Sequence, residues 1–153
     1  MQIRIASVMV ENRDTALRFY TTILGFVKNK DIPMGPTFRW LTVSAPEGAE
    51  GVELVLEPMA FPPAQTYQKA LFAAGIPSTA FITNDIQSEY RRLKSIGVTF
   101  RGEPTPMGPI TAVLFEGTCG TTSSTWSNPS SNSAVRPNAK INSATVPSCT
   151  DSI

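Results

Sequence analysis

The same order of predicted strands and helices occurs twice in this sequence, and an internal repeat limits the possible folds more than any single motif. Asn12 follows a segment rich in β-branched residues and is a good cap for the helix expected after it. Asp85 stands at the same point of the second copy. Gly25 and Gly97 follow the two predicted helices, where glycine commonly ends a helix. The sequence therefore predicts two related modules.

The first module is expected to be a strand, a helix and three further strands. Alternating and β-branched patterns predict its strands at residues 3–10, 26–32, 38–44 and 52–57. A proline-rich connection at 61–64 leads to a predicted helix at 65–74, which Gly75 would end. The second module repeats the pattern with strands at 78–83, 98–101 and 110–116 and a turn at 104–109. One more strand after Glu116 is needed to complete it.

The last part of the chain differs in composition from the modules. Residues 121–153 are rich in Ser, Thr, Asn and Pro and show no helical or strand periodicity, which is typical of disorder. We therefore expect the last strand of the second module to be missing. A missing strand would leave a neighbouring strand with an unpaired edge. We expect one of three consequences: lower stability, recruitment of a strand from elsewhere in the tail, or association through that edge.

A shifted reading frame would explain this tail. Codons can be chosen for residues 121–130 so that reading from two bases later encodes Asp-Leu-Ile-Asn-Leu-Val-Gln-Pro-Val, which has the character of an apolar strand. A natural, flexible C-terminal extension is the alternative. The predicted organisation is a first module at 1–60, a linker helix at 61–76, a second, incomplete module at 77–120 and a low-complexity, frame-shifted tail at 121–153.

The absence of histidine excludes several kinds of chemistry. Catalysis by Ser-His-Asp or Cys-His is impossible, so a general base would have to be Asp, Glu, Lys, Tyr or water. The net charge of +1, without a basic cluster, argues against nucleic-acid binding. No apolar run is long enough for a membrane span, and the first residues lack a signal-peptide pattern, so we expect a cytoplasmic protein without a membrane partner.

Five segments, in order, resemble the glyoxalase / bleomycin-resistance / dioxygenase superfamily, also called vicinal oxygen chelate proteins. They are VENRDTALRFYTTILGF at 10–26, RWLTVSAPEG at 39–48, VELVLEP at 52–58, GIPSTAFITNDIQSEYRRLKSIGV at 75–98 and MGPITAVLFEGTCG at 107–120. The resemblance implies an α+β fold of paired β-α-β-β-β modules (the glyoxalase/bleomycin-resistance fold). It also implies sheets that curl around a shared cavity, often within a homodimer.

The resemblance further implies where a metal would bind, with one ligand on the first strand and one on the last strand of each module. Ile5 and Ser78 occupy the two first-strand positions, Glu53 matches a family ligand position, and the fourth position belongs to the missing strand. A transition metal needs three or four protein donors, so we predict no metal and no other cofactor. A weak Mg²⁺ or Ca²⁺ site made by Glu53 and Glu57 is the alternative.

Alternation along the strands predicts which side chains face the cavity. Leu54 and Leu56 should pack on the helix, whereas Glu53 and Glu57 should face the cavity. A buried Glu53 would need a partner or its pKa would rise, and the nearby Arg4 and Arg39 should point to the other face. Phe38 and Trp40 could instead fill the cavity as core. The predicted ligand-binding residues are Ile5, Ser7, Phe38, Trp40, Glu53, Glu57 and Ser78.

Three functions remain open from the sequence. The favoured one is a metal-free homodimer that binds a small aromatic or cationic compound in the cavity, as bleomycin-resistance members do. The second is a family enzyme of the lyase, isomerase or dioxygenase type that uses Glu53 as a base or weak metal ligand. The third is a truncated product without a selected activity.

Overall fold

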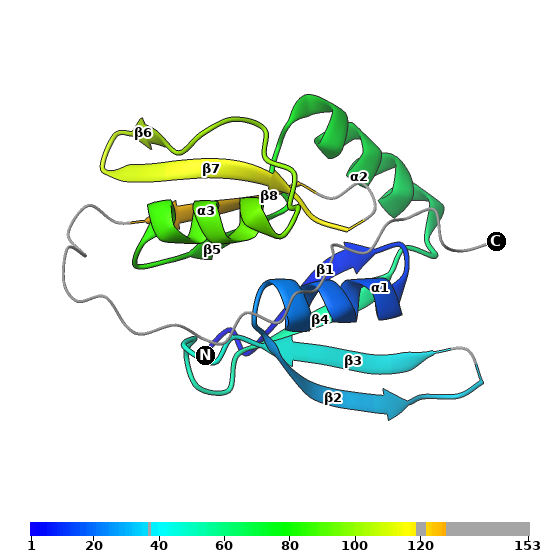
Figure 1. Cartoon of the computed structure of the whole chain (residues 1–153). Helices are drawn as coiled ribbons and strands as arrows, with labels where there is room; N and C mark the ends of the chain where they lie inside the picture. Colours follow the sequence, from blue (N-terminus) through cyan, green and yellow to red (C-terminus); the bar gives the residue numbers. More distant parts are fainter. Residues whose placement is uncertain (37, 119–121, 128–153) are drawn as a thin grey trace.

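The computed structural model describes residues 1–36, 38–118 and 122–127, which form two modules joined by a helix (Figure 1). The first module contains β1 (Ile5–Val10), α1 (Arg13–Arg18) with a π-helical turn η1 (Phe19–Ile23), β2 (Val27–Pro33), β3 (Arg39–Ser44) and β4 (Glu53–Pro58). Helix α2 (Pro62–Ala74) leads to β5 (Thr79–Ile82), α3 (Ile86–Ser95), β6 (Thr105–Met107), β7 (Ile110–Glu116) and β8 (Thr122–Ser127). The predicted pair of β-α-β-β-β modules is confirmed.

The two sheets have the same topology. The strand order is β1-β4-β3-β2 in the first and β5-β8-β7-β6 in the second. In each sheet the first strand of the module runs parallel to the last, while the remaining neighbours are antiparallel. Both sheets therefore place the last strand of the module in an interior position, between its first and third strands.

The helix ends follow the predicted capping residues. The Asn12 side chain accepts hydrogen bonds from the backbone N–H groups of Asp14 and Thr15, both at 3.0 Å. The Asp85 side chain caps α3 in the same way, through the N–H of Ser88 at 3.0 Å. Gly75 ends α2 with φ of 68°, a left-handed conformation that glycine adopts without steric cost. Local signals were therefore sufficient to place these helix ends.

Two predicted segments differ from the structure. Pro62 and Pro63 do not form a connection; they begin α2, because proline suits the first positions of a helix, where its missing N–H has no partner to lose. Residues 98–101 were expected to form a strand, but in the described structure they contribute only an isolated bridge between Phe100 and Phe115. β7 pairs on one edge with β6 instead, which lies within the expected turn, and on its other edge with β8.

The expectation that the second module lacks its last strand was wrong. β8 fills that position, paired parallel to β5 and antiparallel to β7, although its sequence is polar. Pairing on both edges uses backbone N–H and C=O groups, which every residue in this segment possesses, so an apolar pattern is not required for the ladder to form. One of the expected consequences was that a segment of the tail would take the place of the missing strand. β8 corresponds to that alternative. The rest of the predicted tail lies outside the described residues.

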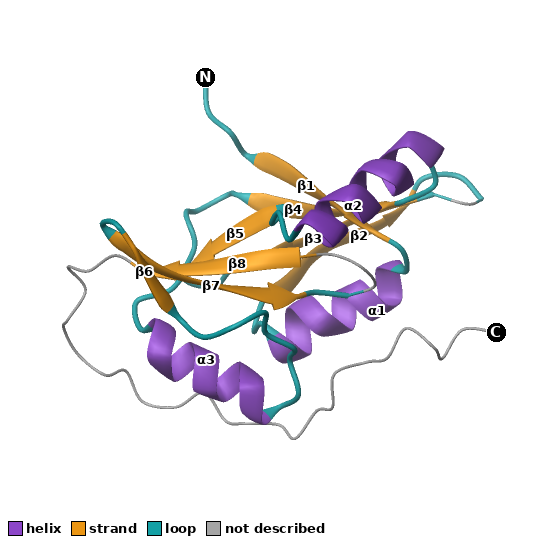
Figure 2. Ribbon diagram, turned by 90° about the horizontal axis from the view of Figure 1, so that it is seen from above, coloured by secondary structure: helices purple, strands orange, loops and turns teal. Residues whose placement is uncertain are grey.

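Helices α1 and α3 lie on the same side of the two sheets (Figure 2), and a single buried cluster on that side joins the modules. Aromatic rings form much of the junction. Phe81 of β5 lies 6.3 Å from the ring of Tyr20 and 5.8 Å from the ring of Phe26, both from the first module. It also stacks on Phe115 of β7, at 6.0 Å. The two modules therefore share one core.

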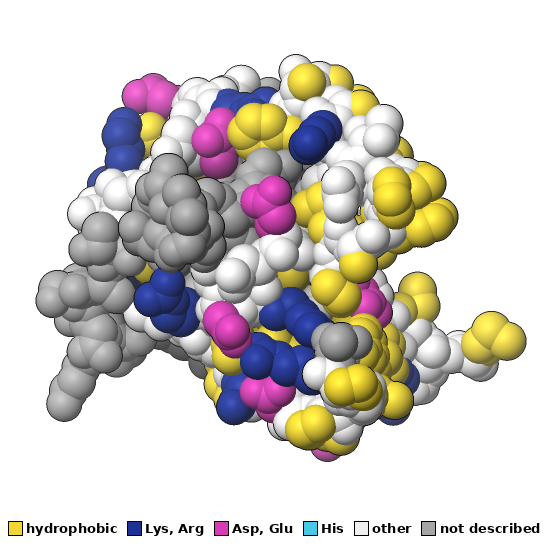
Figure 3. All heavy atoms as spheres, turned by 90° about the vertical axis from the view of Figure 1, so that its right-hand side faces the viewer, with side chains coloured by type: hydrophobic (Ala, Val, Ile, Leu, Met, Phe, Trp, Pro, Cys, Tyr) yellow, Lys and Arg dark blue, Asp and Glu magenta, His cyan; other side chains and the backbone are white. Residues whose placement is uncertain are grey.

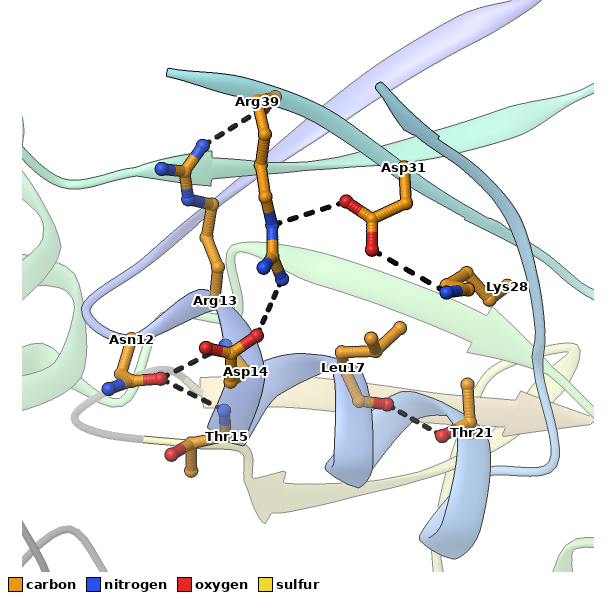
Figure 4. Close-up of polar contacts among 9 residues, drawn as sticks. All are labelled: Asn12, Arg13, Asp14, Thr15, Leu17, Thr21, Lys28, Asp31 and Arg39. Atoms are coloured by element: carbon orange, nitrogen blue, oxygen red, sulfur yellow. Dashed lines mark hydrogen bonds and ion pairs between the residues drawn. The ribbon is translucent and has the colours of Figure 1, made fainter. Parts of the chain in front are cut away.

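A network of charged side chains holds the β2–β3 hairpin against α1 (Figure 4). Arg39 of β3 contacts Asp14 of α1 at 2.6 Å and Asp31 of β2 at 3.4 Å. Lys28 contacts the other oxygen of Asp31 at 3.5 Å, and Arg13 donates a hydrogen bond to the Arg39 carbonyl. Because these contacts lie on the helix side of the sheet, they leave the opposite face free for other side chains.

Candidate functional site

The face of the first sheet turned away from α1 is the candidate site, and we call it the open face. Alternation defines its members, since Val8, Leu41 and Leu56 point into the core on the other side. The strand register then aligns neighbouring side chains on the open face, as in Ser7 opposite Val55 and Ile32 opposite Trp40. Its residues are Ile5, Ser7, Met9, Lys30, Ile32, Trp40, Thr42, Glu53, Val55 and Glu57.

Three polar side chains meet at the centre of the open face. Lys30 Nζ lies 2.5 Å from Glu53 Oε1, and the Thr42 hydroxyl donates to Glu53 Oε2 at 2.7 Å. The same hydroxyl accepts a hydrogen bond from the backbone N–H of Lys30 at 3.1 Å. Thr42 is fully buried and Glu53 is 9% exposed, whereas 45% of the Lys30 side chain remains exposed. Each carboxylate oxygen therefore accepts one hydrogen bond inside the protein, while the ammonium group reaches solvent.

This arrangement determines the protonation of Glu53. The hydrogen bond from Lys30 and then that from Thr42 lower the pKa of the Glu53 carboxyl below its ordinary value, and together they outweigh burial, which raises it. Burial without a partner would have raised the pKa, as expected from the sequence. With its partners present, Glu53 is a stable carboxylate and a weak base.

The partner of Glu53 was not predicted. Arg39 points to the helix side, as expected, and Arg4 donates to the carbonyl of Glu50 at 2.7 Å. Lys30 takes the role instead because the regular hairpin register places it opposite Thr42, on the open face. The irregularity beyond it, between Lys28 and Lys30, places Lys28 opposite the core residue Val43, on the helix side. Pairing the predicted hairpin strands outward from their turn would have placed Lys30 opposite Thr42.

The structure brings most of the predicted site residues together. Trp40 and Glu57 lie on the open face and are both half-buried, and Ile5 and Ser7 lie on the same face of β1 and are exposed. Phe38 precedes β3, and its ring lies 5.6 Å from the guanidinium carbon of Arg13, which belongs to α1. Ser78 directly precedes β5 and so lies in the second module, away from the open face. The described open face thus contains five of the seven predicted residues: Ile5, Ser7, Trp40, Glu53 and Glu57.

With this geometry in place, comparison with known proteins identifies the family. The model of the Glyoxalase/Bleomycin resistance protein/Dioxygenase superfamily matches residues 2–122. The chain belongs to this superfamily. Two similar proteins come from Bacillus subtilis (strain 168). Uncharacterized protein YurT is 51% identical over 78% of this chain and 94% of its own, and uncharacterized protein YetH is 39% identical over 75% of this chain and 88% of its own.

Solved structures agree with this superfamily assignment. UcmS2 is 26% identical, with a TM-score of 0.70 over 82% of this chain and 97% of its own. TnmS3, described as an antibiotic binding protein from Streptomyces sp. CB03234, is 26% identical. It has a TM-score of 0.65 over 84% of this chain and 96% of its own. A superfamily member from Sphaerobacter thermophilus is 25% identical. It has a TM-score of 0.66 over 84% of this chain and 98% of its own. These structures share the fold over nearly their whole length.

The residues of this superfamily member do not fit a metal site on the open face. The resemblance led us to expect Glu53 at a family ligand position, but each of its oxygens accepts a hydrogen bond, and an ammonium group lies 2.5 Å from one of them. Within the described ranges, no group of three or more His, Cys, Asp or Glu side chains is arranged to hold a metal ion. A cation placed at Glu53 would face the positive charge of Lys30, which opposes binding.

A separate surface hollow lies in the second module. It is lined by Tyr90, Lys94, Val98, Thr99, Phe100, Gly102 and Glu103. None of the predicted site residues lines it.

Among the described helices, none combines the length and apolar character needed to cross a membrane.

Proposed function

We propose that this protein binds a small aromatic compound on the open face of its first sheet without using a metal ion. The observation that carries this proposal is the composition of that face. A half-buried Trp40 lies next to a polar centre whose acidic group is already neutralised by Lys30. An aromatic ring beside a few fixed polar groups is a common arrangement for binding flat organic molecules.

The comparison with TnmS3 supports the proposal at the level of ligand class. That protein is described as binding an antibiotic, and it shares 26% identity and the fold with this chain. The similarity supports small-molecule binding and leaves the identity of the compound open. The cationic compound considered from the sequence would depend on Glu57, since the Glu53 carboxylate is already paired.

The enzymatic alternative has weaker support from the geometry. A general base must accept a proton, but the pKa of Glu53 is lowered, first by Lys30 and then by Thr42. Its oxygens also face these two donors rather than an open position. Turnover of a hemithioacetal that is lost in Glu53→Gln and retained in Glu47→Gln would favour this alternative over binding alone.

Fluorescence of Trp40 provides a direct test of the proposed function. The chain has two tryptophans, so Trp126→Phe leaves Trp40 as the only tryptophan reporter. A planar aromatic probe such as 2-naphthamide should change Trp40 emission with saturation, and calorimetry should give the same affinity before and after treatment with EDTA. Trp40→Ala should weaken binding about tenfold, the scale expected for losing one stacked ring. Unsaturable signals, or binding that depends on an added metal, would refute the proposal.

We also propose that the protein forms a homodimer. Apolar side chains are exposed on both sheets: Ile5 is 49% exposed, Ile82 76% and Met107 62%. Figure 3 shows further apolar side chains reaching the surface on the face that lies to the right in Figure 1. Phe61, which caps α2, is 67% exposed. Covering such groups with a second copy would remove them from water. Light scattering at micromolar concentration should give twice the mass of one chain, and a monomer at all concentrations would contradict this.

A further inference from the structure

The hydrogen-bonding capacity at the centre of the open face indicates the chemical class of the ligand. Glu53 uses one oxygen for Lys30 and the other for Thr42. The Thr42 hydroxyl donates to Glu53 and accepts from the Lys30 backbone, and the residue is fully buried. Lys30 differs from both, because an ammonium group has three protons and this side chain is 45% exposed. The polar group of the centre that a ligand can reach is therefore a donor, because Glu53 and Thr42 are buried and Lys30 is exposed.

We propose that Lys30 anchors an aromatic ligand through an acidic oxygen, such as a carboxylate or phenolate, on the open face beside Trp40; this inference rests on the proposed function. A carboxylate ligand would accept hydrogen bonds from the free protons of the Lys30 ammonium while its ring lies on the apolar side chains of the sheet. Ile32 lies opposite Trp40 in the register and adds apolar surface beside the indole.

Glu53 has a supporting role in this arrangement. It holds the Lys30 ammonium over β3 at a fixed position, so that less side-chain freedom is lost when the ligand binds. The carboxylate also keeps the site close to neutral before binding, and the buried Thr42 keeps the carboxylate in place. Glu53 and Thr42 are therefore positioning residues, and Lys30 is the group that contacts the ligand.

The competing possibility is a cationic ligand bound by Glu57. Glu57 lies on the same face, next to the last residue of β4 and paired in register with Met9 of β1. It is half-buried and carries an acceptor, so an aromatic ammonium compound could bind there by charge pairing. The two possibilities predict opposite charge preferences for the same ring, which makes them easy to separate.

Three probes with the same ring test the inference: 2-naphthoate, 2-naphthamide and 2-naphthylmethylammonium. Calorimetry on the full chain at pH 7 should show 2-naphthoate binding about tenfold more tightly than 2-naphthamide, the gain expected for a charge-assisted hydrogen bond. Lys30→Met should remove this preference, while Lys28→Met should keep it. Lys28 is a matched control because it lies on the same strand but contacts Asp31 on the helix side.

A second variant keeps the test valid if Lys30→Met leaves Glu53 unpaired and destabilises the fold. The double variant Lys30→Met with Glu53→Gln removes both charges and retains an acceptor for Thr42, and it should bind 2-naphthoate no better than 2-naphthamide. Equal binding of these two probes by the unaltered chain would overturn the inference. So would a preference for the ammonium probe that is lost in Glu57→Gln, although aromatic binding would then stand. If none of the three probes binds, the proposed function fails as well.

Discussion

Lys30 and Glu53 form an ion pair across an intervening strand. Lys30 belongs to β2 and Glu53 to β4, and their side chains meet at 2.5 Å above β3, which lies between them. Thr42 of β3 donates to the same carboxylate from below. One group of contacts thus links three adjacent strands on the open face, independently of the backbone ladder.

This pair should make stability depend on pH in the acid range. The pKa of Glu53 is lowered from its ordinary value of 4.5, chiefly by Lys30, so the unfolded chain binds more protons there and stability is lost as the pH falls through the folded-state value. The denaturant concentration at the unfolding midpoint should decrease as the pH is lowered from 5. Glu53→Gln should make this decrease smaller. Glu47→Gln, at an exposed position, should keep the steep profile. An unchanged slope in Glu53→Gln would contradict the assignment.

The buried Thr42 hydroxyl should also contribute measurably. Thr42→Val keeps the shape of the side chain but leaves Glu53 Oε2 without its donor, so we expect a loss of about 1.5 kcal/mol in the free energy of unfolding. Thr42→Ser retains the hydroxyl and serves as the control for the hydrogen bond. Chemical denaturation of both variants measures the difference. A Thr42→Val protein as stable as the parent would show that the contact contributes nothing.

The shared aromatic core predicts that the modules unfold together. Phe81 contacts Tyr20 and Phe26 of the first module and Phe115 of the second, so Phe81→Ala should lower the free energy of unfolding by about 3 kcal/mol. The exposed Phe61 is a control of the same type, and Phe61→Ala should change stability by less than about 0.5 kcal/mol. Equal effects of the two substitutions would mean that the rings at the junction are not tightly packed.

The position of β8 between two strands can be tested through its backbone. Ser124 is paired with Ala80 of β5 and with Leu114 of β7. Ser124→Pro removes a backbone donor within an interior strand and should cost about 3 kcal/mol, whereas Ser124→Thr should be tolerated. Native-state hydrogen exchange should show faster exchange in β5 and β7 of the proline variant. A harmless Ser124→Pro would show that this segment is not part of the sheet.

The origin of the tail remains a prediction about the gene. The superfamily match ends at residue 122, so it does not account for the sequence that follows. If a frame shift produced it, the codons for residues 121–130 should encode the apolar sequence when read from two bases later. Codons that do not permit this reading would favour a natural extension instead.

Local sequence signals were enough for most of the fold. Asn12, Asp85 and Gly75 act through contacts within a few residues, so their roles could be inferred before any tertiary structure was known. The β-α-β-β repeat, together with the family resemblance, predicted the module order. The last strand was missed because a polar segment carries no apolar periodicity, and only the free edges of β5 and β7 supply its pairing partners.

The candidate site divides in the same way between sequence and structure. Alternation along β4 was sufficient to place Glu53 on the open face, and the missing histidines already argued against a metal centre. The hairpin register could place Lys30 opposite Thr42, but its contact with Glu53 depends on the tertiary structure, because Lys30 is 23 residues away in sequence and reaches across β3 from a strand that is not adjacent to β4. Residue patterns report which face a side chain takes, but a distance between strands depends on how the whole sheet is paired.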